Sequence, residues 1–166
     1  MAKWFPYGVK EPSVIPEVAN QILKEFFGIV RELDIPACLA YGLCLGFVRD
    51  DGYIPGDNDL DVVVVTENPS LYDDDHTDRL NLAKALEKHG FTVGKMYGPP
   101  SNNMHFHKEH ILVDVFFRKP GVHYADFTTA WHDGELYPVP SPVRGYLEAI
   151  YTNWKKPSNE AGKCGV

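Results

Sequence analysis

The run DLDVVVV at residues 59–65 limits the fold of this chain more than any other stretch. Its valines are typical of a strand in the centre of a sheet, and residues two apart on a strand share a face. Asp59 and Asp61 therefore point the same way, about 7 Å apart along the backbone. Carboxylates in such a place are costly unless something neutralises them. Either they are solvated acids at a strand end, the better explanation for the pair alone, or they hold a divalent cation such as magnesium.

A third acid, Asp114, interrupts a second apolar run, ILVDVFF at residues 111–117. An acid in the middle of an apolar strand needs a partner. One interpretation is an ion pair, for which the sequence offers three candidate cations: Arg49, Arg118 and Lys108. The other interpretation is a third metal ligand on a strand beside Asp59 and Asp61. Three strand-borne acids can hold two magnesium ions, the arrangement used for in-line displacement at phosphorus.

Apolar spacing and turn signals predict the remaining elements. In chain order we expect a helix over 16–33, a strand over 37–41, helical turns over 43–49, the strand over 59–65, a helix beginning near Asp75, a strand over 91–97, a hairpin of 104–107 with 111–117, a short hairpin around Asp133 and Gly134, and a last helix over 143–154. In the second helix, Leu80, Ala83 and Leu86 are expected to face inward, with Gly90 as the C-cap. Together these elements predict an α+β fold with a mixed central sheet flanked by helices.

Composition and charge narrow the class of protein. We expect one domain over residues 1–166, with an irregular start over 1–13 and a loose tail over 155–166. A net charge of −7 argues against a broad surface for duplex nucleic acid. No apolar run approaches the roughly 18 residues that indicate a membrane span, and the first residues lack the apolar stretch of a secretory signal. These features predict a cytoplasmic protein and leave its oligomeric state open.

One long motif resembles a known family. The stretch GLCLGFVRDDGYIPGDNDLDV, residues 42–62, is similar to the signature of the LicD/fukutin family, within the nucleotidyltransferase superfamily of DNA polymerase beta-like fold. Ten positions fall in register without a gap: Gly42, Leu45, Gly46, Arg49, Gly52, Ile54, Pro55, Asp57, Asp59 and Asp61. The run ILVDVFF and the segment LYPVPSPVRGYLEAIYTNWKKP, residues 136–157, resemble later motifs of the family. The resemblance spans about residues 20–157 and implies a minimal nucleotidyltransferase fold.

The resemblance also implies an activity and its cofactor. Family members of this kind transfer a phosphorus-containing group, such as phosphocholine, from a nucleotide or CDP-alcohol donor to a sugar or other hydroxyl acceptor. Asp59 and Asp61 would then be bridging ligands for Mg²⁺ or Mn²⁺, with two ions expected. Asp114 would bind the ion nearest the acceptor hydroxyl or serve as its general base.

The same resemblance assigns donor-binding positions to Gly42, Leu43, Gly46, Arg49 and Asp57. A glycine at position 42 would let the backbone approach the donor phosphates, and Arg49 could pair with one of them. The alternatives are an ion pair of Arg49 with Asp57 or Asp51, and a turn-stabilising role for Asp57. Leu43 departs from the family pattern, because a threonine or serine usually stands there to touch a phosphate. Three further departures do not remove a metal carboxylate: Gly56, Asn58 and Thr152.

Two other functions remain open at this point. One is a nucleotidyltransferase that uses an NTP to modify a small molecule or a protein. The other is a catalytically weakened module that binds a nucleotide or a partner, for which Leu43 is an argument. His105 and His107 share a face of one strand and either line a polar cleft, lie exposed in a hairpin or, less expectedly, bind zinc. The aromatic residues near the C-terminus are expected to pack in the core: Tyr137, Tyr146, Tyr151 and Trp154.

Overall fold

The computed structural model describes residues 14–70 and 77–156. The expectations for residues 1–13, for the beginning of the second helix at Asp75 and for most of the C-terminal tail lie outside these ranges.

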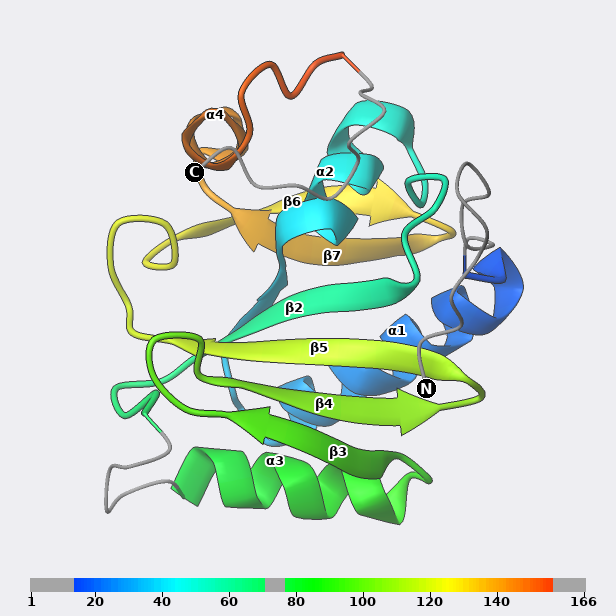
Figure 1. The fold of residues 1–166 in the computed structure, drawn as a ribbon, viewed down its shortest axis with the longest axis vertical. Helices are drawn as coiled ribbons and strands as arrows, with labels where there is room; N and C mark the ends of the chain where they lie inside the picture. Colours follow the sequence, from blue (N-terminus) through cyan, green and yellow to red (C-terminus); the bar gives the residue numbers. More distant parts are fainter. Residues whose placement is uncertain (1–13, 71–76, 157–166) are drawn as a thin grey trace, which may run out of the picture.

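A five-stranded sheet forms the centre of the structure, with strand order β1-β2-β5-β4-β3 (Figure 1). The strands are β1 (Ala37–Leu39), β2 (Asp59–Val65), β3 (Thr92–Tyr97), β4 (Asn103–Lys108) and β5 (Ile111–Arg118). β2 and β5 run parallel, whereas the other three neighbouring pairs are antiparallel. The predicted α+β fold with a mixed central sheet is therefore confirmed, and the two acid-bearing strands are direct neighbours.

Two helices, α1 (Pro16–Glu32) and α3 (Thr77–Lys88), cover one face of this sheet. Every second residue of β2 and β5 packs against them in a dry core, including Leu60, Val62, Val113 and Val115. α1 contributes seven buried side chains: Ala19, Ile22, Leu23, Phe26, Phe27, Ile29 and Val30. Their spacing of three and four residues is the helical period that the sequence showed.

The prediction for the inward face of α3 was wrong at Leu80, which is 49% exposed. The buried positions are Arg79, Leu82 and Leu86, so Leu86 is buried as predicted, whereas the other two positions lie one residue earlier than predicted. Arg79 can take an inward place because its guanidinium donates to the Asn68 carbonyl at 2.8 Å and lies over the Phe117 ring. A long side chain with a hydrogen-bonded head thus replaces a leucine in the core.

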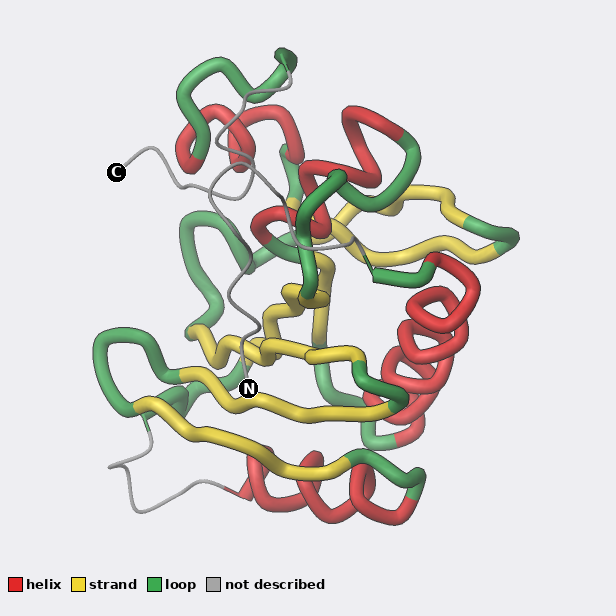
Figure 2. Tube along the Cα trace, turned by 45° about the vertical axis from the view of Figure 1, so that its right-hand side comes forward, coloured by secondary structure: helices red, strands yellow, loops and turns green. Residues whose placement is uncertain are grey.

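The remaining elements lie beyond β1. They are α2 (Tyr41–Asp50), the hairpin of β6 (Phe127–His132) with β7 (Glu135–Pro140), and α4 (Val143–Ile150). Figure 2 shows the tip of the hairpin next to α1, where Asp133 accepts from Lys24 and His132 bonds Asn20. The hairpin is longer than predicted. Tyr41 begins a helix instead of ending a strand, and the last helix stops at Ile150, because Tyr151 adopts an extended backbone.

Candidate active site

Three carboxylates meet on the sheet face opposite α1 and α3. Asp59 and Asp61 come from the first half of β2, and Asp114 lies directly opposite Asp61 on β5. One oxygen from each of the three side chains lies within 4.8 Å of the others. The expectation that the sheet would bring these acids within about 5 Å is therefore confirmed. This spacing follows from the parallel register, since equivalent residues of adjacent strands stand side by side.

Burial raises the pKa of each of these three carboxyl groups. Burial, followed by the charges of Asp57 and Asp114, raises the pKa of Asp59 to about 6. Burial and the three neighbouring acids raise the pKa of Asp61 well above its ordinary value, against the opposing effect of a backbone hydrogen bond from Gly42. Burial raises the pKa of Asp114 as well. Without a cation, the folded state therefore disfavours the ionised form of all three groups.

Gly42, in the first turn of the helix α2, lies beside these acids. A Cβ atom at this position would lie 2.6 Å from Asp57 Oδ2 and 3.6 Å from Asp61 Oδ2. No side chain fits there without moving a carboxylate, so the glycine keeps the acids in place. The backbone also ties α2 to β2, because the Ala40 N–H donates to the Asp61 carbonyl at 3.0 Å. The glycine predicted to admit a donor phosphate thus also makes room for two carboxylates of the protein.

Arg49 lies at the other end of α2, with its side chain 10% exposed. Its guanidinium donates to Asp50 at 2.9 and 2.7 Å and to the Trp154 carbonyl at 3.2 Å. In the described residues it forms no ion pair with Asp57 or Asp51, so that expectation is corrected. Its charge still lowers the pKa of Asp57 against the larger effect of burial. The bond to Trp154 connects the family-like motif of α2 to the C-terminal segment.

Leu43 and Gly46 occupy the interior of the structure. Leu43 is 3% exposed and belongs to the hydrophobic core, so the side chain expected at a donor phosphate points away from solvent. Gly46 allows close packing of α2 on the following loop, because a Cβ there would collide with the Gly52 carbonyl oxygen. For these two residues the structure shows a packing role, and their part in donor binding stays a prediction.

The partners of Asp114 were not foreseen. Asn103 Nδ2 donates to Asp114 Oδ1 at 2.7 Å, and His105 Nε2 lies 3.6 Å from the same oxygen. None of the three cations that the sequence offered forms an ion pair with it in the described residues, although the Arg118 charge lowers the pKa of Asp114. The predicted hairpin of β4 with β5 could have identified His105 as a neighbour of Asp114. Lys108 pairs with Ile111, and counting back through this tight turn places His105 opposite Asp114.

Within the described residues, the two strand histidines belong to no group of three or more potential metal ligands. Their ring centroids are 6.4 Å apart. Within residues 14–70 and 77–156, the three acids are the one group of at least three His, Cys, Asp or Glu side chains close enough to share an ion. His105 lines the site beside Asp114, whereas His107 lies exposed over Gly94, where a Cβ would stand 2.8 Å from its Nε2. His105 therefore lies at the acid cluster, and the interpretation of an exposed hairpin residue applies to His107.

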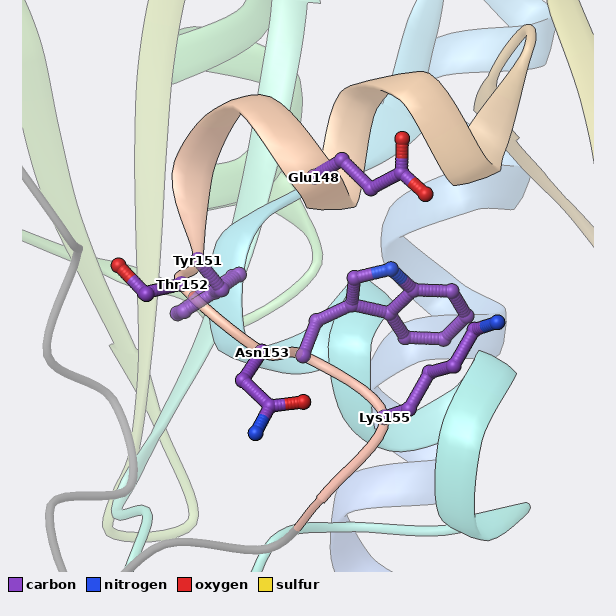
Figure 3. A pocket seen from close by; sticks show the side chains of 6 residues that line it. Glu148, Tyr151, Thr152, Asn153 and Lys155 are labelled. Carbon is purple, nitrogen blue, oxygen red and sulfur yellow. The ribbon is translucent and has the colours of Figure 1, made fainter.

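The C-terminal aromatic residues behave differently from one another. Tyr137, Tyr146 and Tyr151 are core residues, as expected, at 0, 1 and 8% exposure, and Trp154 is partly buried against the same core. Tyr151 and Trp154 line a cavity of about 330 Å³ behind α4. Figure 3 shows its labelled walls, which come from the end of α4 and the segment that follows: Glu148, Tyr151, Thr152, Asn153 and Lys155. None of the three clustered acids lines this cavity.

No helix within the described residues is both long and apolar enough to cross a membrane.

The sheet topology and the acid cluster define a class of protein. Three solved structures share the fold over most of both chains. They are ANT(2'')-Ia in complex with adenylyl-2''-tobramycin, the solution structure of ANT(2'')-Ia, and the lincosamide antibiotic adenylyltransferase LnuA with lincomycin bound. In this order, the three structures are 13, 14 and 16% identical to this chain, with TM-scores of 0.53, 0.55 and 0.50. The matches cover 75, 76 and 75% of this chain and 70, 67 and 83% of the other chains. The fold is therefore that of a nucleotidyltransferase.

The family follows from the sequence. Residues 34–139 match the family described as LicD/FKTN/FKRP, nucleotidyltransferase domain, and the chain belongs to this family. The matched range includes all three acids, α2 and both strands that carry the cluster. A search of curated proteins found no match. Family and fold together support a transferase of nucleotidyl or phosphoryl groups.

Proposed function

We propose that this protein is a divalent-metal-dependent transferase. It moves a phosphorus-containing group, a phospho-alcohol such as phosphocholine or a nucleotidyl group, from a nucleotide donor to a hydroxyl acceptor of the sugar class. The observation that carries the proposal is the cluster of Asp59, Asp61 and Asp114, with ligand oxygens within 4.8 Å of one another. The family match and the nucleotidyltransferase fold support it.

The three acids fit Mg²⁺ or Mn²⁺ by their chemistry. Carboxylate oxygens are the ligands that hard divalent cations prefer. Burial and mutual repulsion raise the pKa of both Asp59 and Asp61. A bound cation removes this repulsion and restores the ionised form of the carboxylates. Asp59 and Asp61 would together hold one or two metal ions, and Asp114 would be the third carboxylate ligand.

The roles of the residues follow from their positions. When bound, the metal would neutralise the donor phosphates and the charge that develops on the leaving oxygen. Asp114 would orient the acceptor hydroxyl or take its proton, since it is the one acid of the three on β5. Gly42 keeps the beginning of α2 clear for Asp57 and Asp61, and its N–H bonds Asp61. Arg49 remains a candidate for donor binding through its positive charge. Asp57 remains a candidate for donor binding as an outer ligand of the metal, because its own negative charge would repel the donor phosphates.

Nucleotidyl transfer from an NTP to a small molecule is the second candidate. It is favoured by the solved relatives, one bound to adenylyl-2''-tobramycin and another described as an antibiotic adenylyltransferase. A weakened binding module has less support. Its argument was Leu43, whose side chain lies in the core, and a module without catalysis has no need of three clustered carboxylates that raise one another's pKa.

A thermal-shift screen tests the proposal. Wild type is melted with CTP, CDP-choline, ATP, GTP or UTP, with and without Mg²⁺, and the screen is repeated on Asp59→Asn. A ligand that binds only the folded state raises the melting temperature by mass action. We expect stabilisation that requires both the metal and Asp59, and the stabilising ligand identifies the donor class.

The matched control is Asp133→Asn, which also removes one negative charge but lies at the tip of the β6–β7 hairpin, paired with Lys24. It should keep the response of wild type. Ligand binding that needs no metal and survives Asp59→Asn would contradict the transferase proposal and favour the binding module.

A further inference from the structure

A buried amide stands behind one acid of the cluster. Asn103, the first residue of β4, is 5% exposed, and its Nδ2 donates to Asp114 Oδ1 at 2.7 Å. His105 Nε2 approaches the same oxygen at 3.6 Å, which is too long for a hydrogen bond. Among the described residues, Asn103 is therefore the side chain that hydrogen-bonds Asp114. Its donor group reaches one oxygen of the carboxylate and leaves Oδ2 without a hydrogen bond from the described residues.

The orientation of this amide is fixed from its other end. Ser101 Oγ donates to Asn103 Oδ1 at 2.5 Å, so the amide oxygen faces the serine and the amide nitrogen faces the carboxylate. Turning the amide over would lose the bond to Asp114, because two acceptors would then face each other there, whereas the serine hydroxyl can either donate to the amide oxygen or accept from the amide nitrogen. The position of Ser101 is fixed in turn by Arg118, whose Nη1 donates to the Ser101 carbonyl at 2.7 Å.

These bonds form a closed connection between two strands. Arg118 and Asp114 both belong to β5, whereas Ser101 and Asn103 end the β3–β4 turn and begin β4. The next turn residue is held as well, because the Asn102 carbonyl accepts from the Phe117 N–H at 2.9 Å. Asp114 is thus tied through Asn103 and Ser101 to its own strand four residues further on, which restricts the rotation of its side chain.

We propose that Asn103 is a positioning residue, which holds Asp114 Oδ1 so that Oδ2 faces the Asp59–Asp61 pair and the cation. The inference rests on the proposed function of the cluster. A ligand that is oriented before the ion arrives loses less freedom on binding, and outer partners of metal-binding carboxylates typically change metal affinity by about 10–100-fold.

The test measures Mn²⁺ affinity of the metal-free full chain by isothermal titration calorimetry, which needs no substrate. Asn103→Leu keeps the approximate volume of the side chain and removes both amide bonds. We expect the Mn²⁺ dissociation constant to rise about tenfold or more. Ser101→Ala removes only the bond that orients the amide, so it should raise the dissociation constant by a smaller factor. Because Ser101 lies in a turn, this variant tests the inference even if Asn103→Leu does not fold.

Thr66→Val is the matched control for loss of a buried polar group. Thr66 is 6% exposed and its Oγ1 donates to Asp78 at 3.0 Å, beyond the far end of β2. The variant should lower the melting temperature as the Asn103 change does but leave Mn²⁺ affinity unchanged. Unchanged affinity in both Asn103→Leu and Ser101→Ala, with wild type binding Mn²⁺, would overturn the inference alone. A wild type that does not bind Mn²⁺ would overturn the proposed function and the inference with it.

Discussion

The two faces of the five-stranded sheet are built from alternate residues of the same strands, yet one packs against helices and the other carries the acid cluster. On β2, Leu60 and Val62 are fully buried under α1 and α3, whereas their neighbours Asp59 and Asp61 project from the other face. On β5 the same alternation separates Val113 and Val115 from Asp114. One face contributes the main apolar core that stabilises the fold, whereas the other gathers the three charges beside a smaller apolar cluster that includes Val63 and Val65.

This difference explains how the protein can keep three repelling acids together. The apolar face fixes both strands in register, and the register fixes the acids. Because each residue belongs to one face only, stability and chemistry are separable in this sheet. Substitutions on the covered face should change the free energy of unfolding, and substitutions on the acid face should change metal binding and activity. The predictions below test this separation.

The largest effect is expected on the acid face, from Asp61→Asn. Removing a metal carboxylate should lower the transfer rate on the order of 10³-fold, since stabilisation of transition-state charge by a metal amounts to several kcal/mol. The same change should raise the melting temperature of the metal-free protein, because it removes one of the clustered charges. Rate and melting temperature are measured on the same preparation. A variant that is both less stable and fully active would show that Asp61 has only a structural role.

On the covered face, Leu60→Ala should lower the free energy of unfolding by about 3 kcal/mol, the usual effect of a cavity in a packed core. Denaturant unfolding measures it, and Mn²⁺ titration of the folded protein should match wild type. Leu80→Ala is the control, because Leu80 lies 49% exposed on α3 and its loss should have an effect of at most about 0.5 kcal/mol. A large change in Mn²⁺ affinity in Leu60→Ala would show that the two faces are not separable.

A smaller effect is expected where α2 meets the acids. Gly42→Ala places a Cβ 2.6 Å from Asp57 Oδ2, and the resulting shift should lower the free energy of unfolding by about 2 kcal/mol and weaken Mn²⁺ binding. The control is Gly28→Ala in α1, where a Cβ has no neighbour within 4 Å. That change should stabilise the protein by about 1 kcal/mol, as is usual for alanine in a helix. Equal results for the two glycines would remove the steric argument for Gly42.

The last prediction concerns pH. The pKa of Asp59 rises from 3.8 to about 6 in the folded state, and that of Asp61 rises as well. In this range the folded state binds protons that the unfolded state has lost, so this contribution to stability is present below pH 3.8 and is lost as pH rises through about 6. The difference in unfolding free energy between wild type and Asp59→Asn, measured in EDTA across this range, should show the loss. Saturating Mn²⁺ should abolish this dependence on pH. A difference in unfolding free energy that does not change with pH would contradict the raised pKa of Asp59.

Much of this architecture was predictable from the sequence because strands alternate and apolar runs are long. The pattern of β2 and β5 located the three acids, and the gapless motif at residues 42–62 indicated the fold. The partners of Asp114 were missed because hydrogen bonding across strands depends on register, and the turn at Glu109 and His110 lacks the usual hairpin residues. The inward place of Arg79 was missed because a charged residue is buried only where distant backbone offers an acceptor.

The most direct test of the metal site is diffraction from crystals soaked in Mn²⁺, with data collected on both sides of the manganese absorption edge. The anomalous signal locates the ion without reference to any assumed ligand. The account predicts a peak between β2 and β5 at coordination distance from carboxylate oxygens of Asp59, Asp61 and Asp114, and no such peak in Asp61→Asn crystals. Occupied manganese elsewhere on the protein, with none at these three acids, would contradict the central claim.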